Sequence, residues 1–102
     1  MIELSGLNLI EISGGGCAGC EELMPAAKRV AENLGIPFLR IECSVAGTLL
    51  SEWGIEKIPA TVLADGKKPV CKCYGYQPEE ILQLFLEAKL EEYQREEKIY
   101  AV

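Results

Sequence analysis

The chain contains no histidine, and its 10 lysine and arginine residues are outnumbered by 16 aspartate and glutamate residues, giving a formal net charge of −6. The absence of histidine counts against a metal site, because metal sites usually combine two cysteine pairs or include histidine. The shortage of basic residues argues against binding to nucleic acid or to anionic membrane surfaces, since both require a positively charged face. We therefore expect neither nucleic acid nor membrane among the partners.

Long apolar runs are also missing. No stretch reaches the roughly 18 apolar residues that a membrane-spanning helix needs. The N-terminus lacks the basic segment and long apolar stretch of a secretory signal peptide. The five cysteines are odd in number and are not spaced like a secreted disulfide framework. We therefore interpret the protein as cytoplasmic, where a C-x-x-C pair is redox-active or metal-binding rather than structural.

The length of 102 residues predicts a single domain, spanning 1–102, with one modest core. The hydrophobic pattern predicts strands at residues 7–12, 38–43, 60–64 and 70–74, and helices at residues 20–34, at 48–53 and from Gln77 onward. The order strand, helix, strand, helix, strand, strand, helix favours a mixed sheet with helices on both faces. Pro25 either kinks the first helix or marks its beginning.

The last helix carries two features of interest. Its predicted core stripe consists of Ile81, Leu84, Phe85 and Ala88. Residues 88–102 form a highly charged helical extension. This extension is either a solvated helix end that frays or a segment that contacts a partner.

Cys17 and Cys20 form a C-x-x-C motif where the first predicted strand passes into the first helix. Three consecutive glycines, Gly14-Gly15-Gly16, allow a sharp turn just before it. Unpaired backbone N–H groups and the positive end of the helix dipole favour a thiolate at Cys17. Cys20 lies one helical turn further along on the same side, and we expect it to be more buried. We therefore predict that Cys17 attacks a disulfide and Cys20 resolves the mixed disulfide.

Glu11 lies in the strand that precedes this motif. Strand alternation places it on one face with Leu7 and Leu9, which predicts a desolvated carboxyl group whose protonated form is favoured. Such a group can accept the proton of Cys20. Two alternatives remain open: an edge-strand charge that points to water, and a carboxylate held ionised by Arg40 on the neighbouring strand.

Pro59 stands at the start of a predicted central strand, where proline is unusual because it cannot donate to the hydrogen-bond ladder. A cis Ile58–Pro59 bond would explain this position and would present the backbone of Ile58 to a ligand. A trans proline that opens the strand is the alternative.

The other three cysteines have less distinctive positions. Cys43 is expected to be a buried, inert thiol on its apolar strand face. Cys71 and Cys73 point to the same side of one strand, where neighbouring side chains stand parallel and rarely form a disulfide. Inert packing is expected for both, with a secondary redox or metal role as the alternative. A thiolate cage of Cys17, Cys20, Cys71 and Cys73 would instead make the protein a metal or cluster carrier.

These residues together resemble the thioredoxin-fold disulfide oxidoreductases over about residues 7–86. The resemblance rests on the redox motif, the buried acid and its basic neighbour, the helix proline, the segment before a cis-proline, the hairpin turn and a late glycine. The redox motif is Cys17-Ala18-Gly19-Cys20, the buried acid is Glu11, its basic neighbour is Arg40, and the helix proline is Pro25. The segment that ends in the cis-proline is Gly54-Ile55-Glu56-Lys57-Ile58-Pro59, the hairpin turn is Asp65-Gly66, and the late glycine is Gly75.

The resemblance implies an α/β, three-layer fold with a four-stranded mixed sheet and helices on both faces. The extra N-terminal strand–helix unit of full-length thioredoxins is lacking. It also implies an enzyme that reduces protein disulfides, with the two motif cysteines and Glu11 as catalytic residues. Ile58 and Pro59 would dock the substrate chain, and Gly75 would let that chain approach. No bound cofactor or metal is expected, the protein is expected to be monomeric, and an upstream reductase must recycle the cysteines.

The motif departs from the family pattern at its supporting positions. Gly16 replaces the usual tryptophan, which removes an apolar contact surface for substrates. Ala18 and Gly19 replace the usual Gly-Pro, which loosens the helix start. We therefore expect a dedicated partner or a specialised reductase rather than broad substrate use. A redox-inert thioredoxin-like interaction module remains the alternative function.

Overall fold

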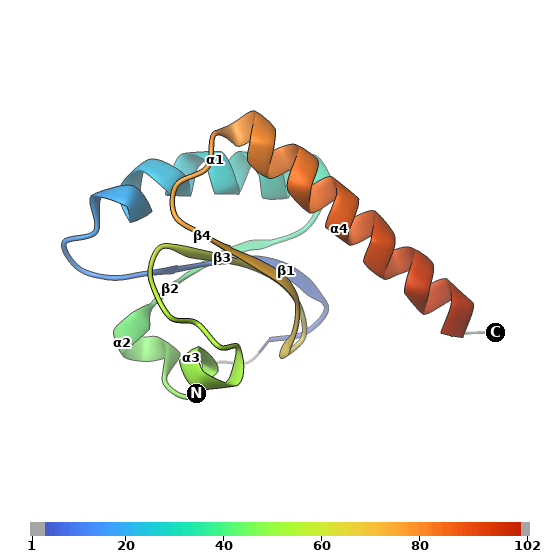
Figure 1. Ribbon diagram of the computed structural model, residues 1–102, viewed down its shortest axis with the longest axis horizontal. Helices are drawn as coiled ribbons and strands as arrows, with labels where there is room; N and C mark the ends of the chain where they lie inside the picture. The colour runs from blue at the N-terminus through green and yellow to red at the C-terminus, as the bar shows by residue number, and fades with distance from the viewer. Residues whose placement is uncertain (1–3, 101–102) are drawn as a thin grey trace.

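The computed structural model describes residues 4–100, with side chains described through residue 96. Four strands form one sheet in the order β2-β1-β3-β4 (Figure 1). They are β1 (Leu7–Ser13), β2 (Phe38–Glu42), β3 (Ala60–Asp65) and β4 (Lys68–Tyr74). β1 pairs in parallel with β2 and antiparallel with β3, and β3 pairs antiparallel with β4. The predicted mixed sheet is confirmed.

Helices cover both faces of this sheet. They are α1 (Ala18–Leu34), α2 (Cys43–Ala46), α3 (Leu49–Glu52) and α4 (Glu79–Tyr100). α1 and α4 lie on one face, and α2 and α3 lie on the other (Figure 1). The predicted three-layer α/β architecture is therefore confirmed. Within the described residues, no helix combines the length and the apolar character needed to cross a membrane.

The predicted charged extension at 88–102 falls on the second half of α4 and ends outside the described residues. Tyr93 ties this part of the helix to the sheet, because its hydroxyl donates to Asp65 at 2.6 Å. The ammonium group of Lys68 also lies 5.2 Å from the Tyr93 ring centre. At least as far as Tyr93, α4 is therefore packed on the β3–β4 hairpin.

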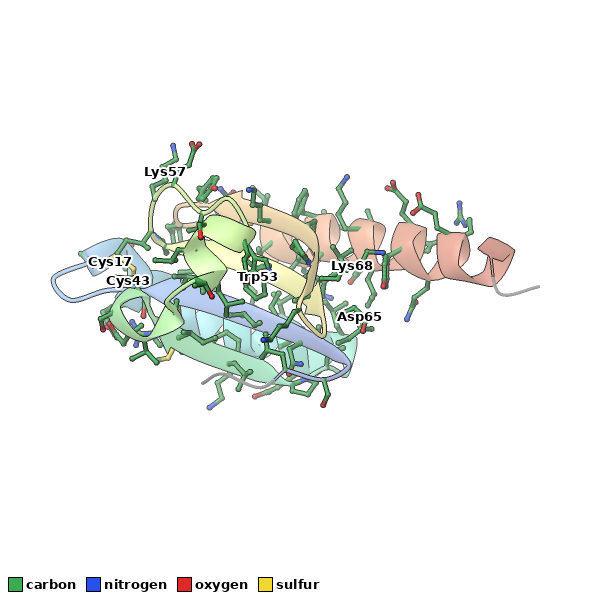
Figure 2. All side chains as sticks on the ribbon, turned by 90° about the horizontal axis from the view of Figure 1, so that it is seen from below. Cys17, Cys43, Trp53, Lys57, Asp65 and Lys68 are labelled. Atoms are coloured by element: carbon green, nitrogen blue, oxygen red, sulfur yellow. A yellow bond between two sulfur atoms is a disulfide. The ribbon has the colours of Figure 1, made fainter. Side chains whose placement is uncertain are left out.

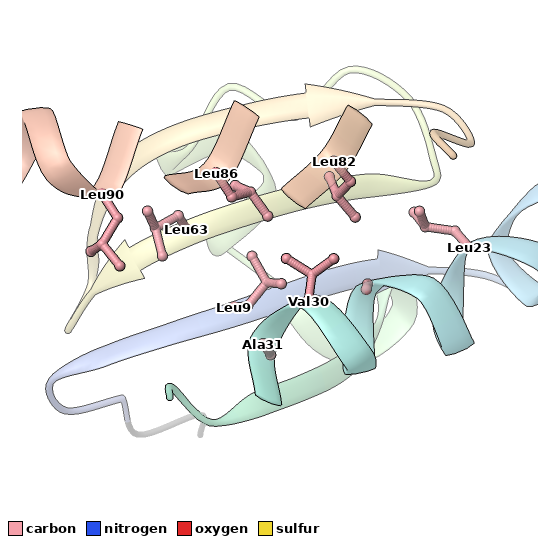
Figure 3. Close-up of a cluster of buried hydrophobic side chains, with 9 residues drawn as sticks. Leu9, Leu23, Val30, Ala31, Leu63, Leu82, Leu86 and Leu90 are labelled. Atoms are coloured by element: carbon pink, nitrogen blue, oxygen red, sulfur yellow. The ribbon is translucent and has the colours of Figure 1, made fainter. Parts of the chain in front are cut away.

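β1 is the central element of the core. All of its residues except Leu7 are buried, as expected for a strand that is covered on both faces. Leu9 faces α1 and α4, whereas Ile10 and Ile12 face α2 and α3. The cluster beneath α1 and α4 is drawn in Figure 3. Its buried members are Leu9, Leu23, Ala27, Val30, Ala31, Leu63, Leu82, Leu86 and Leu90.

α4 matches the predicted stripe only at Phe85, which packs against the core, whereas Ala88 is exposed. Ile81 and Leu84 are 55% and 68% exposed, whereas Leu82, Leu86 and Leu90 face the core. The two stripes have similar three- and four-residue spacing, so the pattern alone does not choose between them. The position of the sheet decides, because the Leu82 stripe continues along the length of the strands.

Two element boundaries differ from the prediction, and one open alternative is decided. Pro25 lies inside α1, so the alternative that the helix begins there is wrong. β2 ends at Glu42, and Cys43 opens a short helix that the pattern did not predict. β4 begins at Lys68 because Asp65 pairs directly with Lys68 across a tight turn.

The position of the α4 stripe can be tested by two leucine truncations. We expect Leu86→Ala to lower the free energy of unfolding by about 2–5 kcal/mol, because it leaves a cavity in the core. Leu84→Ala should change it by no more than about 0.5 kcal/mol, because that side chain is exposed. Urea denaturation measures both, and equal losses would contradict this placement of the helix.

Candidate active site

Cys17 and Cys20 form a disulfide at the N-terminal end of α1. Their Cα atoms are 5.3 Å apart, within the range that a disulfide can bridge. Cys17 is partly exposed, and Cys20 is completely buried. Cys17 is therefore the more accessible of the two cysteines, and the expectation that Cys20 is more buried is confirmed.

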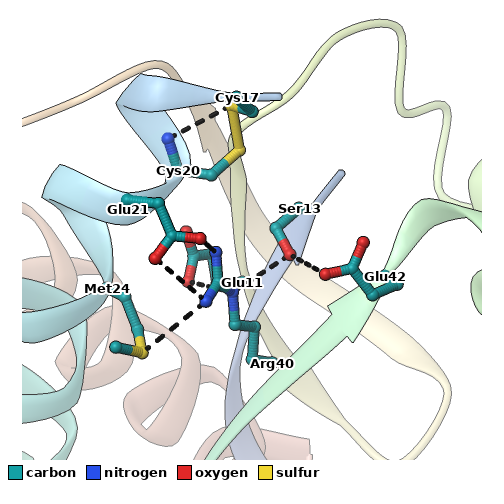
Figure 4. A network of polar contacts seen from close by, with 8 residues as sticks. All are labelled: Glu11, Ser13, Cys17, Cys20, Glu21, Met24, Arg40 and Glu42. Carbon is teal, nitrogen blue, oxygen red and sulfur yellow. Dashed lines mark hydrogen bonds and ion pairs between the residues drawn. A yellow bond between two sulfur atoms is a disulfide. The ribbon is translucent and has the colours of Figure 1, made fainter. Parts of the chain in front are cut away.

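Cys17 is the N-cap residue of α1. Its backbone is extended, and its sulfur accepts a hydrogen bond from the backbone N–H of Cys20 at 3.1 Å (Figure 4). The same sulfur lies at the positive end of a 17-residue helix. When the disulfide is reduced, this N–H group and the helix dipole favour the anionic form of the Cys17 sulfur.

The glycines before Cys17 bring the motif close to two other segments. A Cβ atom at Gly14 would lie 2.7 Å from Cδ1 of Ile58 and 3.2 Å from the sulfur of Cys43, so only glycine fits there without displacement. Gly16 has a φ of +73°, a conformation that favours glycine, and a Cβ atom there would meet nothing within 4 Å. Open space therefore lies beside the motif where the family usually has tryptophan.

Pro59 packs against the motif from the neighbouring loop. A Cβ atom at Gly19 would lie 3.6 Å from Cδ of Pro59, which is ordinary van der Waals contact. The Ile58–Pro59 bond is cis, so the trans alternative is wrong. The carbonyl of Pro59 accepts a hydrogen bond from the backbone N–H of Gly75 at 2.8 Å. The predicted docking residues Ile58, Pro59 and Gly75 thus gather beside the C-x-x-C motif.

The loop that carries Ile58 and Pro59 is anchored by side chains that the sequence analysis missed. The ammonium group of Lys72 donates to the carbonyls of Trp53 and Gly54 at 2.7 and 2.9 Å. The Tyr74 hydroxyl donates to the carbonyl of Gly54 at 2.9 Å and accepts from the backbone N–H of Glu56 at 3.3 Å. No sequence signal identifies this anchor, because it depends on the pairing of β4 with β3.

The C-x-x-C motif lies toward one end of the molecule (Figure 2). Cys17, Cys43 and Lys57 lie toward one end of the long axis, and the hairpin residues Asp65 and Lys68 lie toward the other (Figure 2). The C-terminal end of α4 also lies at the far end from the start of α1 (Figure 1).

Glu11 is completely buried on the face of β1 that α1 covers. Among the described residues, neither of its carboxylate oxygens has a hydrogen-bond partner, and the nearest cationic atom is Nε of Arg40 at 3.5 Å. Burial raises the pKa of Glu11 to about 7, and the positive charge of Arg40 only partly opposes this effect. The edge-strand alternative is therefore wrong, and of the two competing effects burial is the stronger.

The strand register explains why Arg40 reaches Glu11. The two residues are direct partners in the parallel β1–β2 pair. The guanidinium of Arg40 also donates to the carboxylate of Glu21 at 2.7 Å and to the hydroxyl of Ser13 at 3.0 Å. Ser13 in turn donates to Glu42 at 3.4 Å (Figure 4). The site therefore contains one cation among three carboxylates.

Ser13, Glu21 and Glu42 were not predicted as site residues. Strand alternation from Glu11 and Arg40 contains a signal for two of them, because Ser13 and Glu42 each follow by two positions on the same face. For Glu21, the only sequence signal was the general preference of acidic residues for the first turn of a helix. Its hydrogen bond with Arg40 lowers the pKa of the Glu21 carboxyl group.

The three remaining cysteines are free thiols, each partly buried. Burial raises the pKa of Cys71 to about 11, with a further contribution from the neighbouring Cys73. Burial also raises the pKa of Cys73, and the nearby Thr61 hydroxyl opposes this effect only in part. These shifts disfavour the thiolate forms and fit inert packing on β4. Cys43 packs against the cluster beneath α2 and α3 but keeps some exposure.

The four-cysteine cage is not formed. Among the described residues, no group of three or more cysteine, aspartate or glutamate side chains is arranged to hold a metal ion. The carrier alternative loses its basis, because its four sulfurs are not brought together.

A family model described as Thioredoxin matches residues 2–88. The chain belongs to the thioredoxin family. Among solved structures, this family member is similar to a point mutant of the thioredoxin from Halobacterium salinarum NRC-1, with a TM-score of 0.72 and 24% sequence identity. That alignment covers 83% of this chain and 75% of the other, and at this identity it supports the fold alone. No significant match to a curated protein was found. Family membership and the Cys17–Cys20 pair fit a thiol–disulfide oxidoreductase.

The burial of Glu11 predicts a pH-dependent stability that Glu11→Gln removes. Between the ordinary carboxyl pKa of 4.5 and about 7, the folded protein retains a proton that the unfolded chain releases. The wild type therefore loses stability as the pH rises through this range. Glutamine does not titrate, so the variant should gain roughly 3 kcal/mol relative to the wild type between about pH 4.5 and pH 8.

Chemical denaturation of both oxidised proteins across this pH range measures the difference. A stability difference that does not change with pH would show that Glu11 is not protonated in the folded protein near neutral pH.

Proposed function

We propose that this protein is a thiol–disulfide oxidoreductase that reduces disulfide bonds in protein substrates. The observation that carries the proposal is the position of Cys17, a partly exposed sulfur at a helix N-terminus that receives the backbone N–H of Cys20. This arrangement favours a thiolate at the more exposed cysteine of the pair. The buried Cys20 is bonded to Cys17 in the disulfide, so its sulfur is placed to act as the resolving group.

The reaction begins with Cys17. Its thiolate attacks one sulfur of the substrate disulfide, forms a mixed disulfide and releases the first substrate thiolate. Cys20 then loses its proton to the carboxylate of Glu11, and its thiolate attacks the sulfur of Cys17. The second substrate thiolate leaves, and two electrons have passed to the substrate. The protein is left with the Cys17–Cys20 disulfide, which is the state seen in the structure.

A raised pKa suits Glu11 to this transfer. A carboxylate with an ordinary pKa is a weak base toward a thiol, whereas a group with a pKa of about 7 is half ionised near neutral pH and accepts a proton more readily. Its burial on the α1 face of β1, with Arg40 linking it to the residue after Cys20, supports the assignment.

The substrate docks as an extended chain beside the motif. The backbone of Ile58 before cis-Pro59 provides groups for strand-like pairing, and the open space at Gly75 admits the chain from the other side. Gly16, Ala18 and Gly19 leave the rim of the site with small side chains, which supports a dedicated partner or a specialised reductase.

The setting we propose is the cytoplasm, with cell redox homeostasis as the role. The protein acts as a monomer, needs no cofactor, and is returned to its dithiol form by an upstream reductase that supplies two electrons. The net charge of −6 supports a partner other than nucleic acid or an anionic membrane surface.

Serine variants of the two cysteines test the assigned roles. Cys17→Ser should abolish dithiothreitol-driven reduction of insulin, because the attacking sulfur is lost. Cys20→Ser should accumulate a covalent mixed disulfide with the substrate, visible by non-reducing electrophoresis and mass spectrometry. Cys43→Ser is the matched control and should keep wild-type turnover.

Two results would overturn the proposal. Wild-type turnover by Cys17→Ser would mean that another sulfur attacks the substrate. Failure of dithiothreitol to reduce the Cys17–Cys20 disulfide, measured by alkylation and mass shift, would favour the redox-inert interaction module.

A further inference from the structure

Arg40 divides its contacts unequally between two carboxylates near the disulfide. It meets Glu21 with both terminal nitrogens, at 2.7 and 3.5 Å. Its Nε atom donates to Ser13 at 3.0 Å. Toward Glu11 it makes only an ion-pair contact at 3.5 Å, and neither oxygen of Glu11 accepts a hydrogen bond. Each of the three guanidinium nitrogens therefore donates to a group other than the buried acid on the neighbouring strand.

We propose that Glu21 is a positioning residue that holds Arg40 back from Glu11. The catalytic importance of this contact rests on the proposed function, in which Glu11 accepts the proton of Cys20. Glu21 directly follows Cys20 in α1, so one helical turn carries both the resolving cysteine and the group that controls its proton acceptor.

Differences in burial explain why Arg40 favours Glu21. The Glu21 side chain is 67% exposed, so pairing it with Arg40 requires little loss of water from the carboxylate. Glu11 is fully buried, and closing on it would draw the guanidinium further into the protein. A guanidinium hydrogen-bonded to Glu11 would hold that acid ionised and make it a weaker base.

The other groups around Glu11 act in known directions. From β2, the charge of Glu42 raises the pKa of Glu11 and that of Arg40 lowers it, while from α1 the charge of Glu21 raises it. From β3, the residue opposite Glu11 is Thr61, which carries no charge. Removing Glu21 should therefore lower the pKa of Glu11 for two reasons. It deletes a nearby negative charge, and it frees Arg40 to move toward Glu11.

The test is the Glu21→Gln variant of the full chain in its oxidised form. Glu21 is exposed, so this variant keeps the fold. Carbon-13 NMR of the Glu11 side-chain carboxyl follows its titration directly, and the absence of histidine keeps the neutral range clear of imidazole groups. We expect the titration midpoint to fall by about half a pH unit or more.

Glu22→Gln is the matched control. It removes the same charge from the adjacent exposed position of the same helical turn, and its midpoint should stay close to that of the wild type. A midpoint that is unchanged or raised in Glu21→Gln, or lowered equally by Glu22→Gln, would overturn the inference.

A double-mutant cycle separates positioning from simple charge. In an Arg40→Gln background the guanidinium that Glu21 holds is gone, so Glu21→Gln should shift the midpoint by about half as much or less. An equal shift in both backgrounds would show that Glu21 acts through its own charge alone and would overturn the positioning role.

The pH dependence of insulin reduction distinguishes this inference from the proposed function. If the turnover midpoint falls together with the NMR midpoint, both stand. If the NMR midpoint falls and the turnover profile does not, Glu21 still positions Arg40, and it is the role of Glu11 as proton acceptor that fails.

Discussion

The pairing of β1 on both of its edges is the constraint on which the site depends. Its parallel register with β2 sets Glu11 opposite Arg40, and its antiparallel register with β3 sets it opposite Thr61. Because helices cover both faces of this strand, a carboxyl group in its middle has no access to water. Within the described residues, Glu11 is therefore a buried acid that has one cationic neighbour and receives no hydrogen bond on either carboxylate oxygen.

The electrostatics of the site are a competition for a single guanidinium. Desolvation of Glu11 outweighs the attraction of Arg40, because the guanidinium makes its hydrogen bonds to the solvated Glu21 and to Ser13. The exposed acid therefore has a lowered pKa and the buried acid a raised one, although both lie near the same cation. The opposite shifts follow from solvent access, because Glu21 keeps its water while Glu11 loses it.

The site has a helix cap and a proline contact despite the departures at Gly16, Ala18 and Gly19. The sulfur of Cys17 still caps α1, and Pro59 still packs on the helix start through contact with Gly19. What changes is the surface around the sulfur, which carries small side chains and open space where a tryptophan would provide apolar contact. In our proposal this surface, rather than the helix cap, sets the range of substrates.

The sequence by itself determined the elements that depend on local chemistry. The C-x-x-C motif after three glycines placed Cys17 at a helix start, and alternation along β1 placed Glu11 on a buried face.

Tertiary structure decided what depends on alignment between segments. The direction of the sheet decided which stripe of α4 faces the core. The periodicity of a single helix carries no information about that direction. The Lys72 and Tyr74 anchor required β4 beside the loop before Pro59. The hydrogen bond between Glu21 and Arg40 forms only because α1 packs over β2. A charge pair between distant segments produces no periodic pattern in the sequence of either segment, so the sequence does not predict it.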